Sequence, residues 1–86
     1  MQGMNPADNF MFVLRDTGEV WLHKSKPVWI VCYEEIRTPS YIRPTFYQAY
    51  QSIKKPPPGR EPWSVDNRKM SPDGFATLEA AMEASA

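Results

Sequence analysis

The sequence has few of the residues that carry enzyme chemistry or form covalent cross-links. Its 86 residues include one cysteine, Cys32, and one histidine, His23. A single cysteine cannot form an internal disulfide and has no companions for a structural zinc, so we expect no metal and no cofactor. The motifs of phosphate-binding loops, nucleophile elbows and zinc proteases are also missing. These absences predict that the protein is not an enzyme.

Excess charge and long apolar runs are missing as well. Ten basic and ten acidic residues cancel, which argues against a strongly basic nucleic-acid binder and against an acidic DNA mimic. No apolar run approaches the roughly 20 residues that span a bilayer. The N-terminal residues lack the basic-then-apolar order of a secretory signal. We therefore expect a cytoplasmic protein with no membrane partner.

The composition that is present describes one small domain over residues 1–86. Hydrophobic residues make up 42% of the chain and aromatic residues 13%. So short a chain can hardly build two cores, and its aromatic side chains supply large buried areas that offset chain entropy. The pattern leaves open whether residues 1–9 are ordered.

Residues 10–24, FMFVLRDTGEVWLHK, predict two strands joined by a tight turn at Asp16-Thr17-Gly18. With Arg15 opposite Glu19, alternation along the strands divides their side chains between two faces. One face then holds Phe10, Phe12, Leu14, Val20 and Leu22, and the other holds Met11, Val13, Trp21 and His23. We expect the first set to face the core, and the second to be either covered or exposed.

The remaining chain predicts an α+β fold. The apolar run of residues 28–36 is typical of a central strand, and the two prolines of residues 37–44 predict a loop. Helical periodicity over residues 45–55 and over residues 74–86, the latter with Thr77 as its cap, predicts two short helices. With a brief extra strand at residues 63–66, the expected fold is an antiparallel sheet of three or four strands packed by two helices.

Residues 56–62, PPPGREP, form the most unusual stretch. Proline-rich sequence of this kind cannot continue a helix or a central strand and favours polyproline II. We expect an extended strap across the domain. The alternative is an exposed recognition arm that an aromatic groove of a partner binds.

Catalytic pairs are not expected from the predicted strands. Cys32 would lie opposite residue 19 or 20, so roughly 10–13 Å of strand separates it from His23, far beyond hydrogen-bond reach. Glu34 and Glu35 are adjacent and point to opposite faces, so they cannot converge on one metal or substrate atom. This supports a function by binding.

The expected function is that of a small non-catalytic protein-binding module, an adaptor or inhibitor of the accessory kind that phages and mobile elements encode. The candidate binding residues are Trp21, His23, Lys54, Lys55, Arg60 and Trp63. Aromatic residues would anchor the partner and cations would orient it. The partner is another protein, with a homodimer as one option.

The alternative function is binding of single-stranded nucleic acid by residues 37–69. This segment has seven basic residues against two acidic ones, and its aromatic residues offer surfaces on which bases stack. The net charge of zero favours the protein partner.

Overall fold

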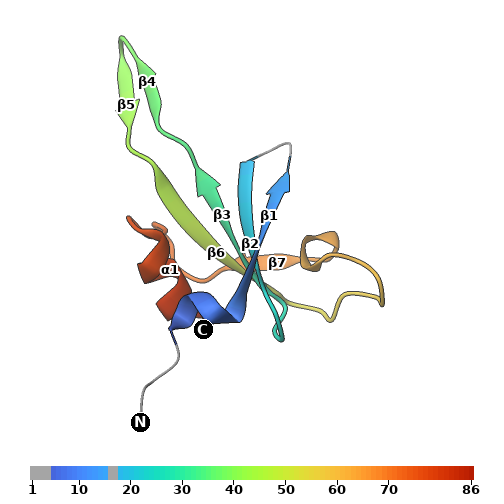
Figure 1. The fold of residues 1–86 in the computed structure, drawn as a ribbon. Helices are drawn as coiled ribbons and strands as arrows, with labels where there is room; N and C mark the ends of the chain where they lie inside the picture. The colour runs from blue at the N-terminus through green and yellow to red at the C-terminus, as the bar shows by residue number, and fades with distance from the viewer. Residues whose placement is uncertain (1–4, 16–17) are drawn as a thin grey trace.

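The structure is a computed structural model that describes residues 5–15 and 18–86 (Figure 1). Residues 1–4 and the predicted turn residues Asp16 and Thr17 lie outside the described residues. The elements in chain order are η1 (Pro6–Asn9), β1 (Phe10–Arg15), β2 (Gly18–His23), β3 (Val28–Tyr33), β4 (Ile36–Thr38), β5 (Tyr41–Arg43), β6 (Phe46–Ser52), η2 (Pro62–Ser64), β7 (Asn67–Lys69) and α1 (Leu78–Ser85).

Five of the strands form one antiparallel sheet in the order β1-β2-β3-β6-β7, and β4 and β5 form a separate two-stranded sheet. The predicted meander of the first three strands is confirmed. So is the central place of β3, since β2 and β6 pair with its two edges. Val28, Ile30, Val31 and Cys32 of this strand are all buried, as its continuous apolar run predicts.

The predicted register of the first hairpin is wrong by one residue. Arg15 lies opposite Gly18, so Phe12 lies opposite Trp21. Because side chains alternate along a strand, this shift moves Trp21 to the face that holds Phe10 and Phe12. Gly18 has a φ of +122°, a conformation that a glycine adopts without strain.

The predicted α+β fold, a sheet packed by two helices, is also wrong. The described chain is mostly sheet, with a single short C-terminal helix. Residues 45–55, predicted as helix, contain β6, which pairs with β3 from Phe46 to Gln51. Pairing buries Gln48 and Ala49 and gives β6 a partner for its backbone on the central strand. Tertiary pairing of this kind overrides a local helical pattern.

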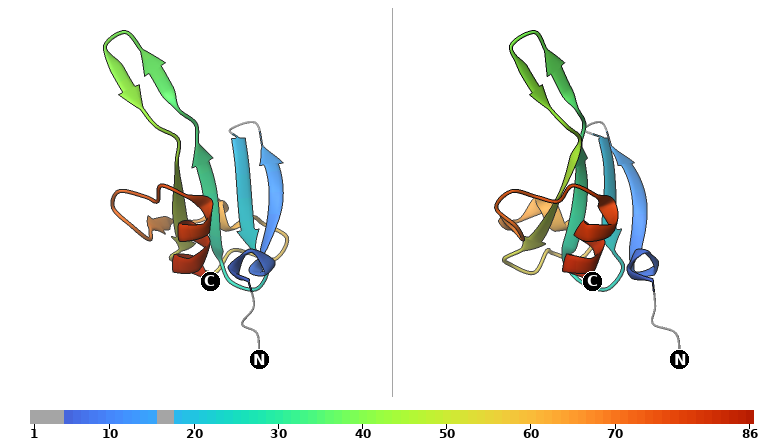
Figure 2. Two further views of the ribbon diagram at one scale, coloured as in Figure 1. Left: turned by 60° about the vertical axis from the view of Figure 1, so that its left-hand side comes forward. Right: turned by 90° about the vertical axis from the view of Figure 1, so that its left-hand side faces the viewer.

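The predicted C-terminal helix is confirmed as α1. The Oγ1 atom of Thr77 accepts a hydrogen bond from the Ala80 N–H at 3.1 Å, as expected of an N-cap. Figure 2 shows α1 lying against one face of the sheet, which we call the α1 face. The core on this face consists of Phe10, Ile30, Ala49, Ala81 and Met82, with Trp21, Tyr47, Phe75 and Leu78 packed around it.

The opposite face of the sheet, which we call the loop face, is covered by the segment between β6 and β7. Trp29 stacks on Tyr50 at 4.5 Å between ring centroids and meets the edge of Trp63 at 5.4 Å. Its Nε1 atom donates a hydrogen bond to Oδ1 of Asn67 at 2.9 Å. The extra strand predicted at residues 63–66 is instead η2 followed by β7.

The proline-rich segment leaves β6 and returns to it. The Arg60 N–H donates to the Pro57 carbonyl at 3.0 Å, and Gly59 in this turn has a φ of +79°. Farther on, the Ser52 hydroxyl donates to the Pro62 carbonyl at 2.7 Å. Residues 53–61 therefore form a loop with a turn in its middle, and both of its ends lie at the end of β6.

Residues 37–44, predicted as a loop, lie largely in a β-hairpin that projects beyond the sheet (Figures 1 and 2). We call residues 36–43 the arm. Thr38 and Tyr41 pair across a two-residue turn, Pro39-Ser40. The prolines end regular pairing only locally, because one lies in the turn and the other, Pro44, follows the strand.

Among the described residues, no helix is both long and apolar enough to cross a membrane.

Candidate functional site

The sequence-predicted binding residues do not gather in one place. Lys54 and Lys55 lie beside His23 on a groove at the end of the sheet, while Trp21 packs on the α1 face and Trp63 on the loop face. Arg60 is exposed in the proline-rich loop. Two surfaces are therefore candidates: this groove, and the arm, which was not predicted from the sequence.

The groove has a volume of about 620 Å³ and lies between the β2–β3 turn and the start of the proline-rich loop. Its lining residues are His23, Lys24, Ser25, Lys26, Pro27, Ser52, Ile53, Lys54, Lys55, Pro56 and Pro62. Among the described residues, this lining includes four lysines and no carboxylate side chain. Such a groove favours an anion over a cation.

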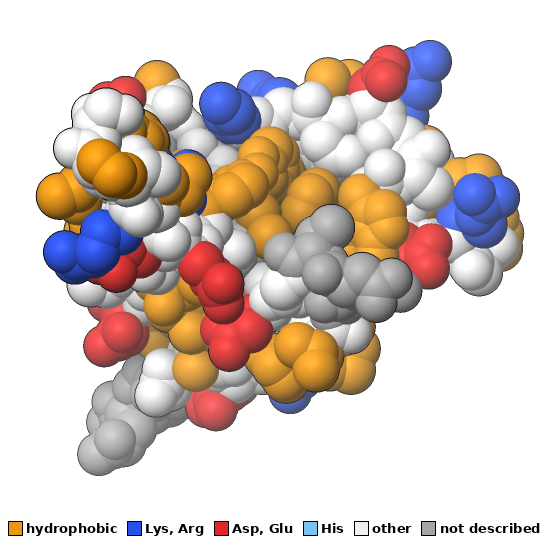
Figure 3. Space-filling model, turned by 90° about the horizontal axis from the view of Figure 1, so that it is seen from above, with side chains coloured by type: hydrophobic (Ala, Val, Ile, Leu, Met, Phe, Trp, Pro, Cys, Tyr) orange, Lys and Arg blue, Asp and Glu red, His pale blue; other side chains and the backbone are white. Residues whose placement is uncertain are grey.

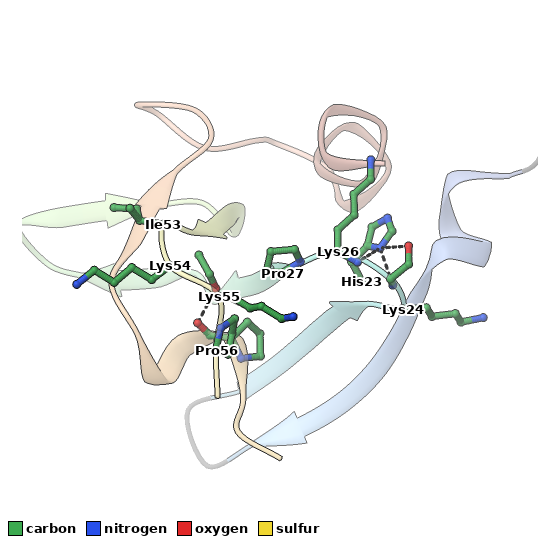
Figure 4. Close-up of a pocket in the computed structure, with 11 residues that line it drawn as sticks. His23, Lys24, Lys26, Pro27, Ile53, Lys54, Lys55 and Pro56 are labelled. Atoms are coloured by element: carbon green, nitrogen blue, oxygen red, sulfur yellow. Dashed lines mark hydrogen bonds between the residues drawn. The ribbon is translucent and has the colours of Figure 1, made fainter. Parts of the chain in front are cut away.

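The four lysines do not converge on one point. Figure 4 shows Lys24 and Lys54 pointing away from each other and Lys26 reaching toward α1. The Lys26 ammonium donates to the carbonyl oxygen of Ala86 at 2.6 Å, where a cation also complements the helix dipole. The groove is therefore a broad basic surface and not a compact phosphate site.

His23 closes the β2–β3 turn through one of its ring nitrogens. Its Nδ1 atom accepts hydrogen bonds from the N–H groups of Ser25 and Lys26, each at 3.1 Å, and its ring meets Phe10 at 5.0 Å. Burial, and then the charge of Lys26, lower the pKa of His23. Since Nδ1 accepts, the neutral ring carries its proton on Nε2, which is buried with no hydrogen-bond partner among the described residues.

The face that holds Trp21, which the sequence left either covered or exposed, is covered in part. The Trp21 ring meets Phe12 at 5.4 Å and Tyr47 at 6.1 Å. Trp21 is half-buried beside the core under α1. It contributes to folding, and its exposed neighbour is Phe12.

Cys32 lies apart from His23, as the sequence predicts. The pairing of Val20 with Val31 places Cys32 beside Glu19, four strand positions from His23. Burial, and then the nearby carboxylate of Glu19, raise the pKa of the Cys32 thiol, which makes the thiol a poor nucleophile. No group of three histidine, cysteine or acidic side chains in residues 5–15 and 18–86 is placed to hold a metal ion.

The arm exposes large apolar side chains on both of its sides. The pairing of Arg37 with Ile42 puts these two on one side, while Ile36 and Tyr41 lie on the other. Tyr41 is 54% exposed and Ile42 62% exposed. Figure 3 shows hydrophobic side chains on the projecting arm and across the adjoining end of the molecule.

The two arginines of the arm make contacts within the chain. Arg37 forms an ion pair with Glu35 at 3.0 Å. Arg43 donates to the Glu34 carbonyl and lies over the ring of Phe46 at 4.9 Å. The apolar side chains of Tyr41 and Ile42, in contrast, remain exposed.

The sequence contains a pattern that indicates the arm. Ile36-Arg37-Thr38 and Tyr41-Ile42-Arg43 are two short runs rich in strand formers, separated by Pro39-Ser40. Such runs flanking a two-residue turn predict a hairpin. Pro39 and Pro44 favour a loop instead, because proline cannot donate a backbone hydrogen bond.

Comparisons with models of protein families, with curated proteins and with solved structures find no match.

Proposed function

We propose that the protein is a small, non-catalytic module that binds another protein by inserting the arm into it. The observation that supports this proposal is the exposure of Ile36, Tyr41 and Ile42 on a hairpin that projects beyond the sheet. Single exposed apolar residues are ordinary on protein surfaces. A projecting element that exposes three of them together is typical of an interaction site.

The geometry of the arm indicates what kind of partner surface would bind it. Apolar residues lie on both sides of the ribbon, with Tyr41 on one and Ile42 on the other. A flat surface would cover only one side, so the fitting site is an apolar cleft that encloses the ribbon.

A cytoplasmic site of action suits the unpaired thiol of Cys32, because cytoplasmic thiols stay reduced.

The test compares two isoleucines that are equally exposed. Ile42 in the arm and Ile53 at the far end of β6 are each 62% exposed. We expect Ile42→Ser to reduce capture of a specific host protein at least tenfold, because it removes an anchor of the interface, a loss of about 1.4 kcal/mol or more. Ile53→Ser should retain full capture. Tagged wild-type and variant proteins would be compared by quantitative mass spectrometry of material retained from lysate.

Thermal melts of the two variants provide the folding control, since both substitutions lie on the surface and should leave the melting temperature nearly unchanged. Equal capture by all three proteins would contradict the proposal. Loss of capture in both variants would contradict it too, because the effect would then not be specific to the arm.

The second candidate function is binding of single-stranded nucleic acid, and the lysine-lined groove favours it. Four lysines line the groove, and no aspartate or glutamate is among the described residues of its wall. The wider basic segment does not form one track, however. Arg37 and Arg43 lie on the arm before β6, and Lys54 and Lys55 follow β6, about 23 Å away along a seven-residue strand. We therefore rank it below protein binding.

A further inference from the structure

The two edges of the five-stranded sheet differ sharply. At one edge, β7 is three residues long and carries Arg68 and Lys69. At the other, β1 is six residues long and has no charge or proline between Phe10 and Leu14. Short length and lysine are the features by which sheets protect their edges from pairing. The β7 edge has this protection, and the β1 edge lacks it.

The backbone of β1 offers a regular set of groups that have no partner among residues 5–15 and 18–86. The Lys24 N–H donates to the Asn9 carbonyl at 2.8 Å, so in the register of β1 with β2 Met11 and Val13 are the residues that bond to β2. The N–H and C=O groups of Phe12 and Leu14 therefore point outward. The Phe10 carbonyl points outward as well, while its N–H is already bonded to Ala7.

The side chains along this edge are apolar on both faces of the sheet. Leu14 is 71% exposed, Phe12 53% and Met11 52%. Phe12 and Leu14 lie on the α1 face beside Trp21, and Met11 lies on the loop face. An edge strand that is apolar on both faces fits another apolar strand and not solvent.

We propose that two copies of the chain pair antiparallel along β1, joining their sheets into one. A two-fold axis perpendicular to the sheet keeps the α1 faces of both copies on the same side, which requires residues of like face to lie opposite each other. The register centred on Phe12 places the two Phe12 residues opposite each other, Leu14 opposite Phe10 and Met11 opposite Val13. Every apolar residue of the edge then meets an apolar residue.

The hydrogen bonds of this register are complementary. Each Phe12 N–H meets the other Phe12 carbonyl, and each Leu14 N–H meets the other copy's Phe10 carbonyl. The register centred on Val13 places Met11 opposite Arg15 and forms three apolar pairs across the two-fold axis instead of five. A second copy suits the edge for a further reason, since residues 10–14 carry no charge that two copies would bring together.

The size of the contact predicts a weak dimer. The side chains of Met11, Phe12 and Leu14, which are 52–71% exposed, each present roughly 100 Å². The apolar area that pairing covers is therefore several hundred Å², below the roughly 1,200 Å² of most stable interfaces. We expect a dissociation constant on the order of 10–100 μM.

Sedimentation equilibrium from about 1 μM to 1 mM tests the proposal on the intact chain. We expect the mass to rise from 9.9 kDa toward twice that value with concentration. Leu14→Lys should weaken the dimer at least tenfold, because it places a charge opposite Phe10. Ile53→Lys makes the same change at an exposed isoleucine far from β1 and should dimerise as the wild type does.

A second variant tests the backbone directly. Leu14→Pro removes an outward N–H without removing a bond to β2, a position at which an edge strand tolerates proline. It should also weaken the dimer at least tenfold. Hydrogen exchange gives an independent readout: the amides of Phe12 and Leu14 should exchange quickly at low concentration and gain protection at high concentration, while those of Met11 and Val13 should be protected at both.

A mass of 9.9 kDa at every concentration would overturn the proposed dimer. A dimer that withstands both Leu14 variants, or that Ile53→Lys also disrupts, would overturn it as well. The β1 edge and the arm are different surfaces, so Ile42→Ser should leave dimerisation intact. Dimerisation and partner capture can therefore fail separately.

Discussion

At the scale of single residues, the fold depends on polar atoms that close its turns. His23 is the clearest case: as hydrogen-bond acceptor for Ser25 and Lys26 it shapes the β2–β3 turn. The sequence predicts His23 as a binding residue because the expected register of the hairpin places it on the same face as Trp21. Its role in the turn depends on a local hydrogen-bond geometry that residue type alone does not reveal.

The role of His23 predicts a loss of stability in mild acid. Its pKa is lowered in the folded chain by burial and by Lys26, whereas the unfolded chain binds the proton near pH 6.5. Between the two pKa values the unfolded state binds more protons, so stability is complete above about pH 6.5 and falls as the pH decreases. Wild-type melting temperature should fall between pH 7.5 and pH 5.5.

His23→Asn provides the matched variant, because the asparagine oxygen can accept the same hydrogen bonds without titrating. It should melt somewhat below the wild type at pH 7.5, having lost the ring contact with Phe10, but with a much smaller dependence on pH. Thermal unfolding followed by circular dichroism measures both curves. Parallel curves for the two proteins would show that another group causes the acid effect.

At the scale of elements, the sequence predicts a strand or a helix correctly where its residues fit only one kind of element. The apolar run of β3 allows no amphipathic helix, and the Thr77 cap and alanine-rich sequence identify α1. Residues 45–55 fit two periods at once, and only their pairing with β3 decides between them. The hairpin register depended on whether its turn had two residues or three, which sequence alone does not fix.

Two glycines with similar backbone conformations predict different costs for the same substitution. At Gly59, with a φ of +79°, an added Cβ atom would meet no described atom within 4 Å, whereas at Gly74, with a φ of +75°, it would lie 2.8 Å from Phe46 and from the Tyr47 carbonyl. Gly59→Ala should cost about 1 kcal/mol of backbone strain. Gly74→Ala should cost about 2–4 kcal/mol, since overpacking adds to the strain.

Denaturant unfolding of both variants measures this difference. The wild type provides the reference, and equal slopes of the unfolding transitions would show that the comparison is one of stability alone. Equal destabilisation of the two variants would mean that the segment at Gly74 can move away from Phe46 and Tyr47 at no cost. The contact that holds residues 71–75 against β6 would then be loose.

At the scale of the whole molecule, the basic residues are divided between two ends of the sheet. The sequence placed them in one segment, residues 37–69, but β6 separates the arm from the lysine-lined groove. Basic residues that are close in the sequence therefore do not share one surface in the fold. The predicted binding residues Trp21 and Trp63 are a second example, because they pack on opposite faces of the sheet.

This division predicts weak binding of single-stranded nucleic acid. In a titration with a labelled strand longer than the roughly 16 nucleotides of a large single-strand site, we expect affinity only at low salt. Lys54→Glu with Lys55→Glu should reduce it, and Arg37→Glu should not, because Arg37 is paired with Glu35. Tight binding at about 0.15 M salt would instead make the groove the main functional surface.

The arm also has a mechanical consequence. It is continuous with β3 and β6, the central pair of the sheet, and only residues 34–35 and 44–45 intervene. A partner that grips the tip and pulls would transmit tension directly into the two strands that carry Ile30 and Ala49 at the core. The arm is therefore an extension of the central strand pair, so that force applied at its tip would act on the core of the sheet.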